Sequence, residues 1–385
     1  MAVYLISFAL SLLLIAYAEK KRLPAFLGVS FFALLIPCLV AGLRQQNIGT
    51  DVMVYVKPLT NAAIMAEDVE QFMDGYWFAD WRNMYIQDYE IGFSMLVYVV
   101  AKLTHSLGAV LFAIQALMVV PVYIALARNR KDIPVWLGML IYYFLFYNAT
   151  LNMMRQWIAM AFLLLAFQML LEKKWWLTAL LCLVALLFHN TAVLAIPIFA
   201  LFWVLWLCRH TQLVHNNLHL QAATVVTGII FVVAIFAIFN LPLVLKVLSL
   251  VGLGQYSNYL EGEQMQLMLS QIVLRLPLLV VLLASWKELC KNDKAAPLYL
   301  ALLLLDMVMS QLVSVDTNTL RIGAYFSVYT ILWIPSVYRV TKPGVKRTVI
   351  ALLCICYAVF YWYYTYIYSL RHETYPYMFF NGGSL

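Results

Sequence analysis

The sequence predicts an all-α, polytopic transmembrane protein, and three observations support that fold class. The 385-residue chain is 65% hydrophobic and only 11% charged, whereas soluble globular chains are roughly half apolar and about a quarter charged. Its apolar residues form continuous runs, unlike the alternating segments of roughly ten residues that build a membrane β-barrel. Basic clusters separate many of these runs, as is typical of cytoplasmic loops.

Helices are expected at each continuous apolar run. The runs lie at about 1–18, 23–43, 91–103, 107–127, 133–147, 156–171, 176–188, 192–207, 222–240, 271–286, 297–313, 322–338 and 348–367. Because a spanning helix needs about 20 residues, we interpret the short run at 91–103 as a half-span or interfacial helix. We expect about twelve full crossings. No basic residue precedes the first run, which indicates a retained helix and not a cleaved signal peptide.

The distribution of charge predicts the orientation of the chain. Placing the basic clusters on the cytoplasmic side accommodates most lysines and arginines and leaves the long polar stretches outside. The net charge of +7 therefore follows from membrane topology, and we expect no nucleic-acid partner. We expect one domain over 1–385, with larger outer loops at about 44–90 and 241–270. The sequence contains no metal-ligand spacing, phosphate-binding loop or dinucleotide fingerprint, so we expect neither a metal nor another cofactor.

Two outer segments place a carboxylate beside an apolar run. In the first, Arg44 is followed by Gly49-Thr50-Asp51 and Tyr55. This combination favours a binding site, although a snorkelling arginine and a capped turn explain the same residues. In the second, Glu90 precedes Gly92 at the start of a run, where an acidic residue also complements the helix dipole.

Two further outer segments carry an arginine and a histidine. Asn152 and Gln156 share a helix face beside Arg155, whose planar guanidinium suits a phosphate. The alternative for Arg155 is pairing with a carboxylate of the outer loop. His189 lies between two apolar runs, where ionisable groups are costly and tend to be functional, although a single interfacial histidine is more often structural.

The last outer helix start repeats the pattern of an acid and an arginine. Asp316 precedes Arg321 and Tyr325, and a local ion pair explains these residues equally well. Together, the segments predict one outward-facing pocket in which arginines hold an anion and carboxylates meet sugar hydroxyls. Without a nucleotide motif, such a site needs a donor that arrives in the membrane, as a polyprenyl diphosphate sugar does.

This ordered set of residues resembles the EpsG-like branch of the Wzy-type exopolysaccharide and O-antigen polymerases of bacteria. The resemblance rests on Arg44…Gly49-Thr50-Asp51…Tyr55, Glu90-x-Gly92-Phe93, Asn152-x2-Arg155-Gln156, Phe188-His189-x-Thr191 with Pro197, Tyr256-Ser257-Asn258-Tyr259, Arg321-x3-Tyr325 and Tyr375-Pro376-Tyr377. It covers nearly the whole chain. Two departures are Thr191, where many relatives have serine, and a first outer loop that is longer than usual.

The resemblance implies a GT-C-like glycosyltransferase that works without a metal ion in the bacterial plasma membrane, with its site facing the periplasm or exterior. Such enzymes move a growing glycan from undecaprenyl diphosphate onto a new lipid-linked repeat unit, which builds exopolysaccharide, O-antigen or capsule. The implied partners are the lipid-linked donor and acceptor, the bilayer, and a chain-length regulator and flippase of the same pathway.

The expected roles follow from this reaction. The residues expected to bind the donor diphosphate and substrate are Arg44, Arg155, Arg321, Asn152, Gln156, Tyr55 and Tyr325. The candidates for the base are Asp51, Glu90 and His189. Three alternatives stay open: a flippase or other transporter, a glycan ligase and a membrane O-acyltransferase. A transporter should carry charges through its spans, where Asp306 is nearly alone. An acyltransferase leaves the arginines without a role, and a ligase shares the polymerase's donor.

Overall fold

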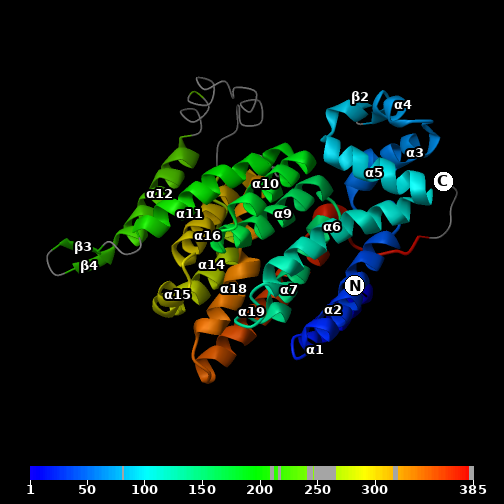
Figure 1. Ribbon diagram of the computed structural model, residues 1–385. Coiled ribbons are helices and arrows are strands. Elements are labelled where there is room, and N and C mark those ends of the chain that lie inside the picture. Colours follow the sequence, from blue (N-terminus) through cyan, green and yellow to red (C-terminus); the bar gives the residue numbers. More distant parts are fainter. Residues whose placement is uncertain are drawn as a thin grey trace. The chain divides into compact units, whose positions relative to one another are not determined.

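The computed structural model describes residues 1–79, 82–208, 212–215, 218–240, 246, 266–314 and 320–380. Helices make up most of these residues (Figure 1). The chain forms two compact units. The first consists of Met1–Ala195 with Ile355–Leu385, and the second consists of Ile196–Cys354. The first unit therefore contains Glu90, Arg155 and His189.

The first unit contains ten helices and a β-hairpin among its described residues. The helices are α1 (Ala2–Ala18), α2 (Leu23–Gly42), α3 (Lys57–Met65), α4 (Val69–Met73), α5 (Ile91–Thr104), α6 (Leu107–Ala127), α7 (Val135–Ile141), α8 (Tyr147–Thr150), α9 (Met154–Leu171) and α10 (Trp175–Phe188). Strands β1 (Tyr76–Ala79) and β2 (Arg82–Tyr85) pair antiparallel, with Tyr76 opposite Tyr85. Short π- or 3₁₀-helical turns lie at Val52–Val56, Ile86–Asp88, Tyr142–Phe146 and Asn190–Leu194.

The second unit is also mainly helical. Its elements are α11 (Ala195–Cys208), β3 (Gln212–His215), β4 (Leu218–Gln221), α12 (Ala222–Phe239), α14 (Leu269–Ala284), α15 (Trp286–Asn292), α16 (Ala296–Met309), α17 (Leu320–Ser327) and α18 (Thr330–Val340), with 3₁₀ turn Ser310–Ser314. Helix α16 packs against α12, α14 and α17. Helix α19 (Val345–Trp362) leads back into the first unit, where Tyr363–Tyr368 and Arg371–Glu373 follow it.

The prediction of an all-α polytopic membrane protein is confirmed. Among the described residues, eight helices are long and apolar enough to cross a membrane, or nine if the bent pair α14–α15 is one span. Five shorter apolar helices accompany them: Ala2–Ala18, Val52–Met65, Ile91–Thr104, Val135–Thr150 and Trp175–Phe188. About twelve crossings, a GT-C-like arrangement and a single domain stay predictions. The run at 91–103 forms a separate helix of 14 residues, α5.

The structure describes the first of the two expected outer loops but only a small part of the second. The stretch at 44–90 is largely structured, because it contains the helical segment Val52–Met65, the short helix α4 and the β1–β2 hairpin. Figure 1 shows α3, α4 and β2 grouped beside α5. In the stretch at 241–270, residues 241–245 and 247–265 lie outside the described residues, and with them the aromatic segment at 256–259.

Aromatic side chains form much of the core of the first unit. Phe8 of α1 stacks on Tyr143 with 5.2 Å between ring centroids, and it meets Trp362 of α19 edge-on at 6.5 Å. All three rings are at most 1% exposed. Aromatic pairs of this kind add specific attraction to their large buried area. They tie the C-terminal part of the chain to the N-terminal helix.

The C-terminal segment also fixes the loop that follows α2. Gln45 N donates to Met378 O at 2.9 Å, and Gly49 N donates to Glu373 O at 3.1 Å. The Tyr377 hydroxyl donates to a carbonyl oxygen of α2 at 2.8 Å. The tail thus pairs with the loop that carries Arg44 and Asp51, and these contacts hold the backbone of that loop in place.

The two ends of helix α9 have different chemical character. At its C-terminal end, Glu172 forms an exposed ion pair with Arg128, which follows α6, and it also pairs with Lys174. Arg155 lies in the first turn of the same helix. Because an α-helix rises 1.5 Å per residue, the 18 residues of α9 separate these ends by about 27 Å. The predicted site residues on α9 therefore lie far from this basic cluster.

Candidate functional site

Glu90 contacts two of the other predicted site residues at once. Its Oε2 accepts a hydrogen bond from Arg155 Nη1 at 2.5 Å, and its Oε1 interacts with His189 Nδ1 at 2.8 Å. The backbone N–H of Asn190 also donates to Oε1, at 3.2 Å. The Glu90 side chain is only 8% exposed. One partly buried carboxylate therefore joins an arginine and a histidine from two other segments.

Helix ends bring these three residues together. Glu90 immediately precedes α5, His189 immediately follows α10, and Arg155 lies in the first turn of α9. Helices α9 and α10 pack against each other, and α10 also contacts α5. A Cβ atom at Gly92 would lie 2.6 Å from the Leu187 carbonyl oxygen. Glycine in the first turn of α5 is thus what allows Glu90 to approach His189 closely.

The electrostatic state of Glu90 follows from its partners. Burial by itself raises the pKa of the carboxyl group, but the hydrogen bond with His189 and the positive charge of Arg155 outweigh burial and lower the pKa to about 2. Glu90 is therefore ionised at neutral pH, and an ionised carboxylate can only accept hydrogen bonds. His189 must then carry a proton on Nδ1.

Asp51 joins the same neighbourhood through Tyr55 and Asn152. The Tyr55 hydroxyl donates a hydrogen bond to Asp51 Oδ2. Asn152 Oδ1 accepts from the Asp51 backbone N–H and from the Thr50 hydroxyl, each at 3.0 Å. Burial and the charge of Asp51 raise the pKa of Tyr55 well above its usual value, so the phenol keeps its proton and remains a donor to Asp51.

Gly49 allows the Gly-Thr-Asp turn to lie against the turn before α9. Its φ is +82°, which L side chains rarely adopt, and a Cβ atom there would lie 2.4 Å from the Leu151 carbonyl oxygen. The sequence allowed two interpretations, a binding site or a tight backbone turn. The two are compatible, because the tight turn places Asp51 beside Asn152.

Aromatic rings link the Asp51 part of the cluster to the Glu90 part. The Arg155 guanidinium carbon lies 5.1 Å from the ring centre of Tyr55 and 4.7 Å from that of Tyr89, within the range of cation–π attraction. Trp77 of the hairpin stacks on Tyr89 at 5.6 Å. The cluster is therefore continuous from Asp51 through Tyr55 and Arg155 to Glu90 and His189, with aromatic walls.

Most of the predicted site residues gather here. The cluster contains Asp51, Tyr55, Glu90, Asn152, Arg155 and His189 of the first unit. Gln156, the neighbour of Arg155 in α9, is 5% exposed. The sequence left open whether Arg155 pairs with a carboxylate of the loop at 44–90, and the structure shows such a pair with Glu90. Arg321 and Tyr325 lie in α17 of the second unit, so their place in the site stays a prediction. Asp316 lies outside the described residues.

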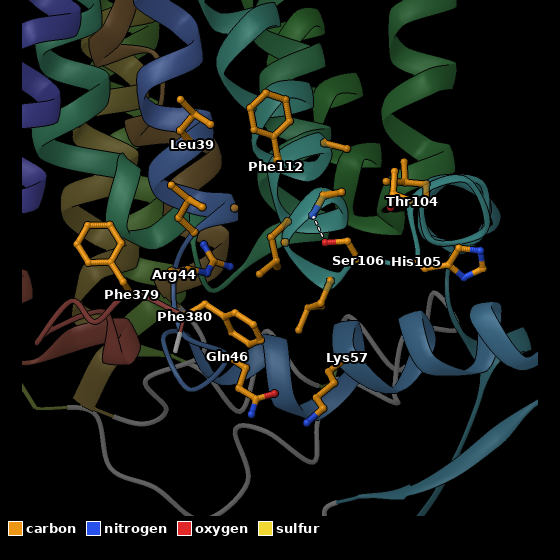
Figure 2. A pocket seen from close by; sticks show the side chains of 18 of the residues that line it. Leu39, Arg44, Gln46, Lys57, Thr104, His105, Ser106, Phe112, Phe379 and Phe380 are labelled. Carbon is orange, nitrogen blue, oxygen red and sulfur yellow. Dashed lines mark hydrogen bonds between the residues drawn. The ribbon is translucent and has the colours of Figure 1, made fainter. Parts of the chain in front are cut away.

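Arg44 occupies a different environment from Arg155. It is only 3% exposed, and its Nη2 donates to the Leu151 carbonyl oxygen at 3.0 Å. Its Nε has no hydrogen-bond partner, and the structure gives it no carboxylate within ion-pair distance among the described residues. Burial lowers the pKa of Arg44. The side chain lines a cavity between α2 and α6 (Figure 2).

Sequence reasoning did not assign a role to Tyr89 and Trp77, or find the partner of Asp306. The only sequence signal for the two rings was an outer stretch rich in aromatic residues. Arg275 of α14 binds Asp306 of α16 through Nε at 2.6 Å and Nη2 at 3.3 Å. The interpretation of Asp306 as nearly alone within the spans was therefore wrong, because Arg275 is a second charge inside an apolar run.

The cluster offers a proton acceptor, a cation and flat apolar walls. A histidine oriented by a carboxylate can accept a proton, and an arginine can stabilise developing negative charge. Tyrosine and tryptophan rings present apolar faces with polar edges. Across the parts of the chain that the structure describes, no group of three His, Cys, Asp or Glu side chains could hold a metal ion.

Comparison with known proteins identifies the family. No curated protein and no solved structure matches the chain. The family model described as EpsG family matches residues 4–379, which is nearly the full length and confirms the resemblance inferred from the residues. The chain belongs to the EpsG family and is a multi-pass membrane protein implicated in exopolysaccharide biosynthesis.

Proposed function

We propose that this protein is a glycosyltransferase that polymerises undecaprenyl-diphosphate-linked repeat units into exopolysaccharide, O-antigen or capsule. The observation that carries the proposal is the simultaneous contact of Glu90 with His189 and Arg155. Transfer of a glycan from a diphosphate needs a base for the acceptor hydroxyl and positive charge for the leaving group. The cluster supplies both beside aromatic walls, and membership of the EpsG family supports the same reaction.

His189 is the base in this proposal, and Glu90 is its positioning residue. Because Nδ1 donates its proton to the ionised Glu90, the neutral ring has an unprotonated Nε2. That nitrogen can accept a proton from a sugar hydroxyl, in the way that a carboxylate-oriented histidine acts in hydrolases. Asp51 is the alternative base, and its hydrogen bond from Tyr55 favours a supporting role.

The reaction balances with these groups alone. The acceptor hydroxyl oxygen forms a bond to the anomeric carbon of the donor, and the hydroxyl proton moves to His189 Nε2. The bond between the anomeric carbon and the diphosphate oxygen breaks, and the lipid diphosphate leaves with the electron pair. Arg155, together with Arg44 and Arg321 by prediction, stabilises the charge of this leaving group, so no metal ion takes part in the proposed step.

The charges at the ends of α9 support an outward-facing site in the bacterial plasma membrane. Arg128 and Lys174 lie at the end of α9 opposite Arg155. Since basic residues concentrate on the cytoplasmic side of membrane proteins, the Glu90 cluster belongs on the periplasmic or outer side. There it meets lipid-linked repeat units after a flippase has moved them across, and a chain-length regulator would act on the product.

The test uses purified full-length protein in lipid nanodiscs with one synthetic undecaprenyl-diphosphate-linked repeat unit. We expect a ladder of products in the presence of a metal chelator. Glu90→Gln should abolish the ladder, whereas Glu70→Gln, at an exposed glutamate of α4, should leave it intact and serves as the matched control.

Other outcomes identify the other classes of protein. Unchanged substrate that moves between leaflets of a liposome indicates a flippase. A single transfer that requires a lipid A core indicates a ligase, and transfer of an acyl group indicates an O-acyltransferase. Loss of the ladder in both glutamate variants would remove Glu90 from its proposed role.

A further inference from the structure

The second unit carries a strongly basic surface where two segments at the ends of its helices meet. One segment contains α15 and the residues that lead to α16, and the other joins α18 to α19. Helix α15 contacts α18 (Figure 1). The hydroxyl groups of Ser285 and Thr341, both buried, lie 3.3 Å apart and join the two segments. We call the surface formed by residues 286–294 and 339–347 the α15–α19 surface.

Positive charge is in excess on the α15–α19 surface. The surface has two acidic residues and seven basic ones, which are Lys287, Lys291, Lys294, Arg339, Lys342, Lys346 and Arg347. Glu288 Oε1 lies 3.1 Å from Lys346 Nζ, and Asp293 Oδ2 lies 4.0 Å from Arg339 Nη2. The other five basic residues form no ion pair among the residues that the structure describes. The protein therefore leaves most of this positive charge uncompensated.

Helix α15 presents lysines on one face. It turns by 65° away from α14, so it runs across the end of that helix. Lys287 and Lys291 are four residues apart and share the exposed side of α15. Leu289, on the opposite side, is completely buried. Because like charges at this spacing repel each other, an anion bound between the two lysines would stabilise this arrangement.

The start of α19 adds a second group of cations. Lys346 and Arg347 lie in its first turn, where no acidic residue accompanies them. Cations at a helix N-terminus are unfavourable, because that end already carries partial positive charge. The Arg347 guanidinium carbon lies 4.0 Å from the ring centre of Tyr338, and this cation–π contact orients the guanidinium without neutralising it. This group therefore also favours an anion.

Exposed apolar side chains adjoin the cations. Leu283 near the end of α14, and Val345 and Val349 of α19, are exposed. Helix α19 belongs to a candidate span, and α14 belongs to the bent pair that together meets the same criteria. Basic residues at the ends of spans concentrate on the cytoplasmic side. The α15–α19 surface thus has the composition expected where acyl chains meet the headgroups of the cytoplasmic leaflet.

We propose that the α15–α19 surface binds an anionic phospholipid of the cytoplasmic leaflet. The phosphate lies between the lysines of α15 and the start of α19, and the acyl chains lie against the exposed side chains of α14 and α19. Basic clusters of this size beside a span are typical of anionic lipid binding. A free phosphate would leave the apolar side chains without a partner, and a zwitterionic lipid would leave the positive charge uncompensated.

The binding test uses full-length protein in phosphatidylcholine nanodiscs that contain a small fraction of a phosphatidylglycerol probe with a diazirine near the glycerol. After irradiation, mass spectrometry should locate the label on residues 283–294 or 345–353. A phosphatidylcholine probe with the same diazirine should label these residues about tenfold less, because basic residues near a membrane surface attract anionic lipids. Unlabelled phosphatidylglycerol should compete, and inorganic phosphate should not.

A double variant removes the charge of the lysine face. Lys287→Gln with Lys291→Gln should lower labelling by phosphatidylglycerol about tenfold or more. Lys287→Arg with Lys291→Arg keeps the charge and should label like the wild type. Lys20→Gln with Lys21→Gln, in the turn between α1 and α2 of the first unit, is the matched control and should also label like the wild type.

The stability of the double variant provides a second measurement. Without anionic lipid, the unfolding temperature of the glutamine variant should equal or exceed that of the wild type, because the substitutions remove repulsion between like charges. Added phosphatidylglycerol should raise the unfolding temperature of the wild type more than that of the variant. An equal rise in both proteins would contradict binding at α15.

Three labelling results would overturn the proposal. These are equal labelling by the two probes, equal labelling of the glutamine and control variants, and labels that map elsewhere. Competition by inorganic phosphate as strong as that by phosphatidylglycerol would indicate a soluble anion and would also overturn it. The lipid site does not rest on the proposed polymerase activity, since the product ladder and the lipid label are measured separately.

Discussion

The loop after α2 and the start of α9 each carry an arginine for which the sequence predicts the same role, but the two side chains have different partners. Arg155 binds Glu90 at 2.5 Å and lies over two tyrosine rings. Arg44 is more deeply buried and has a backbone carbonyl oxygen, not a carboxylate, as its closest acceptor. Arg155 therefore has a direct ion-pair partner, whereas Arg44 lines a cavity and feels the charge of Asp51 without an ion-pair contact.

This difference separates the two regions. Arg155 and His189 share Glu90, so the charge in that cluster is balanced by direct contacts. Arg44 instead donates to the Leu151 carbonyl oxygen and feels the charge of Asp51 without an ion-pair contact. We therefore expect the Glu90 cluster to carry the proton transfer, and the following predictions test the two regions separately.

The largest expected effect is on the chemical step at the Glu90 cluster. Because general base catalysis contributes roughly 100- to 10,000-fold, His189→Ala should lower the rate of polymerisation by about that factor. It should leave the binding of the lipid-linked donor unchanged, since in the proposal the arginines hold the diphosphate and His189 does not. The measurement is the initial rate of product formation, with donor binding as the second readout.

A conservative variant tests how Glu90 acts. If Glu90 positions His189 through its carboxylate, Glu90→Asp should retain part of the polymerisation rate that Glu90→Gln loses, because only the aspartate keeps an ionised acceptor for the His189 Nδ1 proton. A Glu90→Gln variant with full activity would argue against a role through His189.

The next effect tests whether the planar guanidinium of Arg155 matters beyond its charge. Arg155→Lys keeps the charge but loses the planar fork and its fit over the tyrosine rings, so the rate should fall on the order of 100-fold. Arg128→Lys, in the exposed pair with Glu172, is the matched control and should change the rate little. Undiminished polymer length with Arg155→Lys would remove Arg155 from the proposed stabilisation of the leaving group.

The free energy of unfolding should respond differently to removal of the two arginines. Arg155→Met leaves the partly buried Glu90 without one of its partners, which should lower the free energy of unfolding by about 1–3 kcal/mol. Arg44→Met removes a buried cation that has no carboxylate partner, so the free energy of unfolding should stay the same or rise. Thermal unfolding in detergent provides the comparison. Equal destabilisation by both variants would show that Arg44 is compensated after all.

The smallest effect is the pH dependence of stability at Glu90. Its pKa of about 2 in the folded protein lies below the ordinary value of 4.5, so the folded state binds fewer protons in this range. The stabilisation is complete above pH 4.5 and disappears as pH falls toward 2. The difference in unfolding temperature between wild type and Glu90→Gln should therefore close over that window. For the exposed Glu70→Gln, we expect no such difference, and a constant gap for Glu90→Gln would contradict the assignment.

Local sequence patterns predicted most members of the Glu90 cluster but not how they pair. Asp51, Glu90, Arg155 and His189 are recognisable because each is a polar residue at the end of an apolar run, where ionisable side chains are unusual. The pairing of Arg155 with Glu90 could be named only as an alternative, because 65 residues separate the two. Tyr89 was one of many aromatic residues in its stretch, and nothing local distinguished it from its neighbours.

The cavity at Arg44 could not be predicted at all. It depends on the crossing at Gly42 and Gly108 and on a tail that pairs with the loop more than 300 residues earlier. Each of these residues has an ordinary local explanation. Only their meeting in space leaves a cavity and an arginine Nε without an acceptor.

The sequence by itself determined that the chain is a helical membrane protein of the EpsG family, because hydrophobic run length and ordered motifs are properties of the chain alone. The tertiary structure decided which charges neutralise one another. Coulomb attraction and burial depend on distance and surroundings, and these are fixed only when helices from distant segments pack. The same residue type therefore forms an ion pair at Arg155 and bonds a backbone carbonyl oxygen at Arg44.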